Sequence, residues 1–216
     1  MRKLLLTEHA ALAIGKGPLG RVRHEIVSSD VVARALPSGS VHQGAALLCE
    51  PLRRLDIHDV LSKPFEKRRI LLILDQITDP HNVGAIMRSA AAFEANAVVV
   101  QDRHAPLESG VLAKSASGAL DIVPYIEVVN IARALEDVAK LGFWRVALVG
   151  DGEQGLSDAV SVGDIALVLG SEGSGIRRLV REHCDVSACI PIRAEVESLN
   201  VSNAAAIALY ELRRDS

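Results

Sequence analysis

The chain has few aromatic residues, 3% of its 216, so its core must be built from aliphatic side chains. It has three cysteines, an odd number without C-x-x-C spacing, which argues against a disulfide framework or a cysteine metal site and favours the cytoplasm. The sequence has no run of about 18 apolar residues, so no membrane-spanning helix is expected. The first residues contain only three consecutive leucines, too few for the apolar part of a secretory signal.

An excess of positive charge is also missing. The 24 basic and 27 acidic residues give a net charge of −3, which counts against extensive non-specific binding of nucleic-acid phosphates but allows a local basic patch. Basic residues gather in two stretches, each of which by itself is more typical of a solvated face or a linker. The members are Arg53, Arg54, Lys63, Lys67, Arg68 and Arg69 in the first stretch and Arg177, Arg178 and Arg181 in the second.

From Ile70 onward, short apolar runs alternate with amphipathic stretches. This pattern predicts an α/β fold with a mainly parallel sheet flanked by helices. The continuous apolar run 70–74 is typical of a strand covered on both faces. We expect the strands near 70–74, 97–100, 121–124, 145–149, 165–169 and 186–190, and the helices near 83–93, 131–140, 176–183 and 203–213.

The part of the chain ahead of this pattern has a different character. Residues 1–56 alternate short apolar pieces with turn residues and predict a small α+β domain, in which the residues after His42 form a strand. Residues 57–69 are charged and contain Pro64, so they are the expected linker. The larger domain is expected to span 70–216.

Polar residues follow three of the predicted strands, where ligand crevices form in open α/β sheets. Asn82 and Arg88 lie beyond the first strand, in or next to a helix with one apolar face. Glu172 lies in a glycine-rich turn after the strand near 165–169, and Ser198 and Asn200 precede the last helix.

Each of these residues also has a structural explanation. Asn82 could cap the helix beside it. Ser198 and Asn200 could be turn residues, and Ser202 or Asn203 could cap the last helix. Arg88 could be an ordinary surface residue, and the glycines of 170–175 could form a plain turn. Their order is G-x-x-G-x-G, whereas the dinucleotide fingerprint is G-x-G-x-x-G, so a nicotinamide-dependent oxidoreductase is the weaker alternative.

Three segments carry the polar residues: Asp75–Ala90, Ile165–Gly175 and Glu197–Tyr210. In this order and spacing they resemble the three motifs of the SpoU (TrmH-like) branch of the SPOUT RNA methyltransferases. The closest likeness is to the ribosomal RNA guanosine 2′-O-methyltransferases of the RlmB type. It covers residues 68–214 well and the preceding part only partly. The resemblance implies a trefoil knot in the carboxyl-terminal part of the larger domain.

The resemblance also implies a set of catalytic residues. In such enzymes the matching positions form a polar ring around the reacting ribose. Here that ring would consist of Asn82, Arg88, Glu172, Ser198 and Asn200. Arg88 would stabilise the developing alkoxide, and no metal ion is implied.

The methyl donor implied by the resemblance is S-adenosylmethionine. Backbone groups of Gly170, Ile190 and Leu199 would bind it, which suits a flat, apolar adenine with donors and acceptors on its edge. Because SPOUT sites are usually completed across two copies, the resemblance also implies a homodimer.

The substrate implied by the resemblance is a guanosine of 23S ribosomal RNA. In RlmB-like enzymes a small, ribosomal-protein-like domain recognises RNA, and His42-Gln43-Gly44 resembles its end. The segment ahead of it looks shortened, so residues 1–56 are expected to be a partial RNA-recognition domain. The alternatives are a transfer RNA ribose 2′-O-methyltransferase and a non-catalytic RNA-binding protein that retains the fold.

Overall fold

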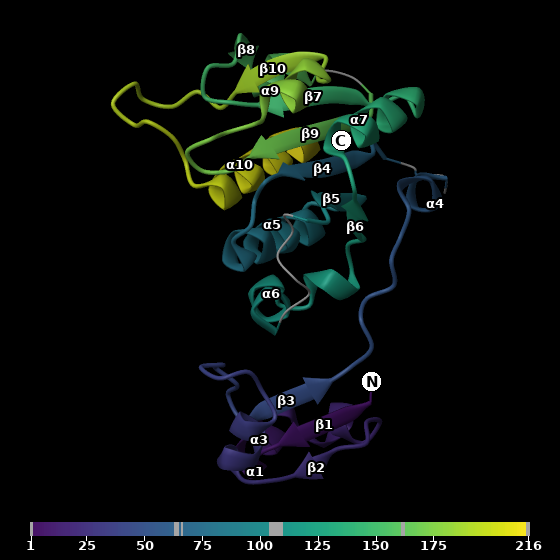
Figure 1. Ribbon diagram of the computed structural model, residues 1–216, viewed down its shortest axis with the longest axis vertical. Helices are drawn as coiled ribbons and strands as arrows, with labels where there is room; N and C mark the ends of the chain where they lie inside the picture. Colours follow the sequence, from purple (N-terminus) through teal and green to yellow (C-terminus); the bar gives the residue numbers. More distant parts are fainter. Residues whose placement is uncertain (1, 63–64, 66, 104–109, 161–162, 215–216) are drawn as a thin grey trace. The chain divides into compact units, whose positions relative to one another are not determined.

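The computed structural model describes residues 2–62, 65, 67–103, 110–160 and 163–214. The chain forms two compact units, Met1–Leu52 and Arg53–Ser216 (Figure 1). The second unit thus includes residues 53–69, whereas the larger domain is expected from the sequence to begin at residue 70. The stretch expected to be a linker contains helix α4 (Ile57–Leu61), because its apolar side chains at i, i+3 and i+4 are buried in the core of the second unit.

The first unit is built on a three-stranded sheet in the order β2-β1-β3. β1 pairs in parallel with β2 and antiparallel with β3, and the small core consists of Leu5, Val32 and Ala46. The strand expected after His42 is β3. The elements are β1 (Lys3–Leu6), α1 (Glu8–Ile14), α2 (Lys16–Leu19), β2 (Glu25–Ile26), α3 (Ser29–Arg34) and β3 (Ala45–Leu48).

The second unit contains a seven-stranded sheet in the order β6-β5-β4-β9-β7-β10-β8. All its neighbouring strands pair in parallel, which confirms the predicted α/β fold. The strands are β4 (Ile70–Asp75), β5 (Ala97–Gln101), β6 (Tyr125–Val128), β7 (Trp144–Leu148), β8 (Gln154–Gly155), β9 (Ile165–Gly170) and β10 (Val186–Cys189).

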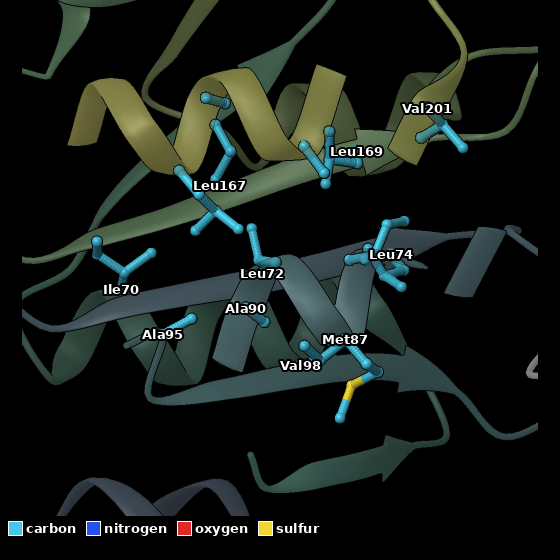
Figure 2. Close-up of a cluster of buried hydrophobic side chains, with 14 of the residues drawn as sticks. Ile70, Leu72, Leu74, Met87, Ala90, Ala95, Val98, Leu167, Leu169 and Val201 are labelled. Carbon is cyan, nitrogen blue, oxygen red and sulfur yellow. The ribbon is translucent and has the colours of Figure 1, made fainter. Parts of the chain in front are cut away.

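Helices cover both faces of this sheet, and the side chains of β4 alternate between them. Ile70, Leu72 and Leu74 belong to one apolar cluster, shown in Figure 2, and Leu71 and Ile73 belong to the other. The first face carries α5 (Pro80–Ala92), α6 (Gly110–Ala116), η1 (Ala119–Asp121), α8 (Leu156–Ala159) and α10 (Val201–Arg214). The second face carries α4, α7 (Ile131–Lys140) and α9 (Arg178–Glu182).

One predicted strand, 121–124, is wrong. The 3₁₀ helix η1, which follows Gly118 with its φ of 87°, ends at Asp121, residues 122–124 form no strand, and β6 starts only at Tyr125. Pro124 has no N–H for a strand ladder, and the strand begins directly after it. The other expected strands and helices of this unit are present, with ends that differ by three residues or fewer.

The strand order reverses next to β4. The chain leaves β4 through β5 and β6 and later returns to place β9 on the other side of β4. Asp75, the last residue of β4, pairs with Gly170, the last residue of β9. In an open α/β sheet, ligand crevices form at such a switch point, beyond the carboxyl ends of the strands. The trefoil knot stays a prediction, since strand order alone does not define how the chain threads.

Candidate functional site

Three side chains from distant parts of the sequence meet beyond the carboxyl ends of the central strands. Nδ2 of Asn200 donates to Oε1 of Glu172 at 2.6 Å and to Oδ1 of Asn82 at 3.1 Å. Nδ2 of Asn82 donates to the same oxygen of Glu172 at 3.3 Å. The structure therefore joins one predicted site residue from each of the three motif segments in a single polar cluster.

Asn82 is available to this cluster because another residue caps its helix. Asp79 is the N-cap of α5, where its side chain accepts from the backbone N–H of His81, and Pro80 occupies the first helical position. Both are favoured residues at these positions. The alternative that Asn82 caps the helix is therefore wrong, and its side-chain amide lies in the first turn with both ends in the cluster.

Asn200 combines a structural contact with its place in the cluster. Its Oδ1 accepts from the backbone N–H of Ser202 at 2.9 Å and from the Ser202 hydroxyl at 2.6 Å. This satisfies one of the backbone donors at the start of α10 that have no partner inside the helix. The cap of the last helix is therefore supplied by Asn200 and not by Ser202 or Asn203.

Glu172 is held by a turn that requires glycine. A Cβ atom at Gly170 would lie 2.2 Å from the carbonyl carbon of Gly175, and Gly173 and Gly175 have φ values of 89° and 64°. The N–H of Gly175 closes the turn by donating to the carbonyl of Ser171 at 2.9 Å. The glycine pattern thus reflects backbone geometry and places the Glu172 carboxylate near the start of α10, where negative charge is favoured.

The sequence does not predict an ion pair that lies at the carboxyl ends of the same strands, in which the aspartate is buried and the arginine is partly exposed. Among the described residues, Asp75 is the only charged residue that is buried, with 0% of its surface exposed. Its Oδ2 accepts from the backbone N–H of Arg177 and its Oδ1 from Nε of Arg177, both at 2.8 Å. The available signal was a single carboxylate at the end of an otherwise apolar strand.

Arg88 lies apart from the polar cluster. Its side chain is exposed on α5 and takes part in no hydrogen bond or ion pair within the described residues. It lines a hollow of about 610 Å³ between α5, the α6–η1 region and α10. Ser202 lines the same hollow and also contacts Asn200, so the hollow adjoins the cluster. Within the described residues of one copy, Arg88 forms no hydrogen bond with the cluster.

Ile190 directly follows β10, and Ser198 and Leu199 lie in the segment between β10 and α10. Ser198 is exposed and makes no hydrogen bond among the described residues. Ile190 and Leu199 are half-buried, and no hydrogen bond of the described chain reaches their backbone groups. Such amide and carbonyl groups beside aliphatic side chains fit the edge and faces of an adenine. Gly170 ends β9.

The two basic stretches are partly used in structural ion pairs. The backbone N–H and Nε of Arg69 both donate to Asp164 at 2.7 Å, and Arg181 contacts Asp151. Lys63 lies outside the described residues. These pairs support the structural explanation of the two stretches more than a continuous basic patch.

Two further findings limit what the described residues can do. They contain no cluster of three or more His, Cys, Asp or Glu side chains that could hold a metal ion. Within the same residues, no helix has both the length and the apolar character needed to cross a membrane. The cluster of Asn82, Glu172 and Asn200 offers hydrogen-bond donors and acceptors that can orient a hydroxyl-bearing ligand.

Comparison with known proteins adds independent findings. Residues 69–210 match the model of the SpoU rRNA Methylase family. The 23S rRNA (guanosine-2′-O-)-methyltransferase RlmB of Coxiella burnetii is 45% identical over 179 residues, which cover 82% of this chain and 72% of the relative. The protein of the same name from Escherichia coli is 43% identical over 183 residues, which cover 82% and 73%.

A solved structure agrees with the fold. The SpoU methyltransferase AviRb of Streptomyces viridochromogenes, in complex with AdoMet, superposes with a TM-score of 0.81 at 24% identity. The superposition covers 99% of this chain and 82% of that one. At this identity the likeness supports the fold alone.

Proposed function

The chain belongs to the SpoU rRNA methylase family, and from this membership we propose that it transfers the methyl group of S-adenosylmethionine to the 2′-hydroxyl of a guanosine in 23S ribosomal RNA. The observation that carries the proposal is the contact of Asn82, Glu172 and Asn200 at the switch point of the sheet. The substrate follows the printed activity of relatives at 43% and 45% identity.

In this reaction a bond forms between the ribose oxygen and the methyl carbon while the bond between carbon and sulfur breaks. The donor supplies an activated methyl group, and the protein has to align the oxygen with it and stabilise the developing negative charge. The cluster of Asn82, Glu172 and Asn200 offers both hydrogen-bond donors and acceptors for orienting the ribose, with Ser198 two residues away in the sequence.

Arg88 acts as a fixed cation in this proposal. A guanidinium essentially never gives up its proton in a protein, so we assign it stabilisation of the 2′-alkoxide and binding of the adjacent phosphate, whose oxygen accepts the proton. Its exposure and lack of a partner among the described residues support this role, since a paired arginine would be less available to a phosphate.

Backbone groups of Gly170, Ile190 and Leu199 bind the donor in this proposal. Two observations support the assignment: the tight turn after Gly170, and the backbone groups of Ile190 and Leu199 that no hydrogen bond within the described chain reaches. Gly170 is the last residue of β9, and Glu172 lies two residues beyond it. Ile190 directly follows β10, and Leu199 lies shortly before α10. A donor bound there would lie next to the ribose-orienting cluster.

The working form is proposed to be a homodimer. Within the described residues of one copy Arg88 forms no hydrogen bond with the cluster, and the hollow that holds Arg88 is bordered by small residues of α5 and α10. Exposed apolar side chains lie on the same helix α10, with Ile207 44% and Tyr210 57% exposed. A second copy packed on this face would cover them and bring an arginine from one copy towards the cluster of the other.

Residues 1–56, which contain the first unit, are proposed to be a partial RNA-recognition domain. Lys16, Arg21 and Arg23 are exposed and make no ion pair within the described chain, so they are available to phosphates. Such contacts fix register on the RNA and carry no sequence information. The cytoplasm is the proposed location, and the three cysteines, all of them unpaired, are consistent with it.

The test is incorporation of labelled methyl groups from S-adenosylmethionine into 23S ribosomal RNA, with transfer RNA as a parallel substrate. The proposal expects incorporation into 23S RNA, whereas labelling of transfer RNA alone would assign the alternative substrate. Calorimetric titration separates the other two alternatives. A non-catalytic RNA-binding protein would bind RNA without transfer, and an oxidoreductase would bind NAD(P)H instead of the methyl donor.

A further inference from the structure

The side chain of Arg177 joins separate segments at the carboxyl ends of the strands of the large sheet. Its Nε donates to Asp75 at the end of β4, and its Nη2 donates to Oε1 of Gln101 at the end of β5, both at 2.8 Å. Nε2 of Gln101 in turn donates to the carbonyl of Val129, the residue after β6, at 3.1 Å. One guanidinium thus connects the segment that follows β9 to the ends of three neighbouring strands.

This connection is held firmly because Asp75 is fully buried. Both of its carboxylate oxygens are occupied by Arg177, one by the backbone N–H and one by the guanidinium. A buried carboxylate that loses its partner is strongly unfavourable. The position of Arg177 is therefore set by the end of β4.

The pair closes the turn that carries Glu172. At its entrance the turn is fixed by the pairing of Gly170 with Asp75 and by the contact of Gly170 with Gly175. At its exit, two residues beyond Gly175, it is fixed by Arg177. We infer that Arg177 is a positioning residue for methyl transfer, which acts by holding Glu172 where it contacts Asn82 and Asn200. This inference rests on the proposed function.

A second arginine–aspartate pair, at the amino ends of the strands, serves as a matched control. The backbone N–H of Arg145 donates to Asp185 at 2.8 Å and its Nε at 2.9 Å, which is the same kind of pair. Arg145 lies near the start of β7 and Asp185 directly precedes β10, so neither adjoins Glu172. Arg177→Lys and Arg145→Lys each keep the charge and remove the planar fork of donors.

The kinetic test combines these variants with Glu172→Gln. Arg177→Lys is expected to lower kcat by about ten- to a hundredfold, because a small misplacement of an orienting group is costly in rate, while KM for RNA changes little. In the Glu172→Gln background the same substitution should have no further effect, since coupled residues are non-additive. Arg145→Lys should leave kcat unchanged. The inference would be overturned if Arg177→Lys lowered kcat just as much in the Glu172→Gln background. An equal loss of kcat in Arg145→Lys would overturn it as well.

A second readout does not depend on activity. The amides of Gly175, Val201 and Ser202 donate to Ser171, Glu172 and Asn200, respectively, so their hydrogen exchange reports on the turn and the cluster. Exchange should accelerate at least tenfold in Arg177→Lys and stay unchanged in Arg145→Lys. Equal exchange in the two variants would contradict the inference.

The two readouts also separate the inference from the proposed function. If the expected exchange pattern appears but the wild-type protein transfers no methyl group, the proposed function fails, whereas the control of the turn by Arg177 stands. If Arg177→Lys does not fold, Gln101→Met removes only one of the contacts of Arg177. It should give the same pattern with a smaller amplitude, and wild-type exchange together with wild-type kcat in Gln101→Met would contradict the inference.

Discussion

The two ends of the Asn200 side chain serve different purposes. Its oxygen accepts from Ser202 at the start of α10, and its nitrogen donates to Glu172 and Asn82. An aspartate could cap the helix equally well, but it would place a second carboxylate against Glu172. The amide is therefore needed for the cluster, although the cap alone would accept either residue.

Arg88 provides the most direct test at the residue scale. Arg88→Ala should lower the rate of methyl transfer by about 10²–10³, which is the usual loss when one preorganised charge contact to a transition state is removed. Donor affinity should stay nearly unchanged, because the proposed donor site is formed by Gly170, Ile190 and Leu199. Single-turnover kinetics and calorimetry measure the two quantities.

Arg88→Lys is the companion variant. It should restore little of the activity, since a point charge does not reproduce the planar fork of donors. Because Arg88 has no partner among the described residues, both variants should melt at the wild-type temperature. Turnover near the wild-type rate in Arg88→Ala would show that the assignment of Arg88 is wrong.

Cys184 should resist alkylation in the folded protein. Burial raises the pKa of its thiol to about 12, and its Sγ donates to the carbonyl of Val180 at 3.4 Å. At pH 8 the reactive thiolate is therefore almost absent. Iodoacetamide followed by mass spectrometry should label the exposed Cys49 and leave Cys184 unmodified until the protein is denatured. Labelling of both cysteines at the same rate would contradict this.

At the scale of elements, the close packing of α5 against α6 depends on Gly84. A Cβ atom at this position would lie 2.4 Å from Cβ of Ser115 and 2.8 Å from its carbonyl carbon. Gly84→Ala should therefore lower the free energy of unfolding by about 1–3 kcal/mol, as overpacking does, which denaturant titration measures. Gly110→Ala on α6 is the control, because a Cβ there meets nothing within 4 Å. Equal stability of the two variants would refute the close contact.

Most elements of the second unit could be predicted because their patterns are strong. The apolar run of β4 and the 3.6-residue spacing of α5 and α7 follow directly from burial. Helix α4 was hidden in a charged stretch, because a single helical turn with three buried side chains leaves little periodicity. The strand at 121–124 was misplaced because an apolar pair, Ile122 and Val123, occurs in a 3₁₀ turn and its exit.

The candidate site could be predicted in part. Asn82, Glu172 and Asn200 were named from the motifs, and the structure brings them together. The pairing of Asp75 with Arg177 could not be foreseen, because the two residues are far apart in the sequence and meet only through the order of the strands. The capping of α5 by Asp79 was missed because Asn82 offered an equally plausible cap chemistry.

At the scale of the whole molecule, the chain consists of two units with separate cores. The residues assigned to the donor and to the ribose all lie in the second unit. A variant with only residues 53–216 should therefore retain donor binding and the dimer but bind RNA much more weakly. Gel shifts at one fixed salt concentration measure this, because phosphate contacts depend strongly on salt.

Two outcomes would change this view of the molecule. Equal RNA affinity of the truncated and full-length proteins would show that the first unit has no part in recognition. Loss of donor binding on truncation would show that the donor site depends on residues of the first unit.

The chemical position of the transferred methyl group tests the central claim most directly. 23S ribosomal RNA that lacks the modification is incubated with the protein and S-adenosylmethionine, digested to nucleosides and analysed by mass spectrometry. The proposed function predicts 2′-O-methylguanosine as the product with the wild-type protein and its near absence with Arg88→Ala. A methyl group found on a base, or no methylated nucleoside at all, would contradict it.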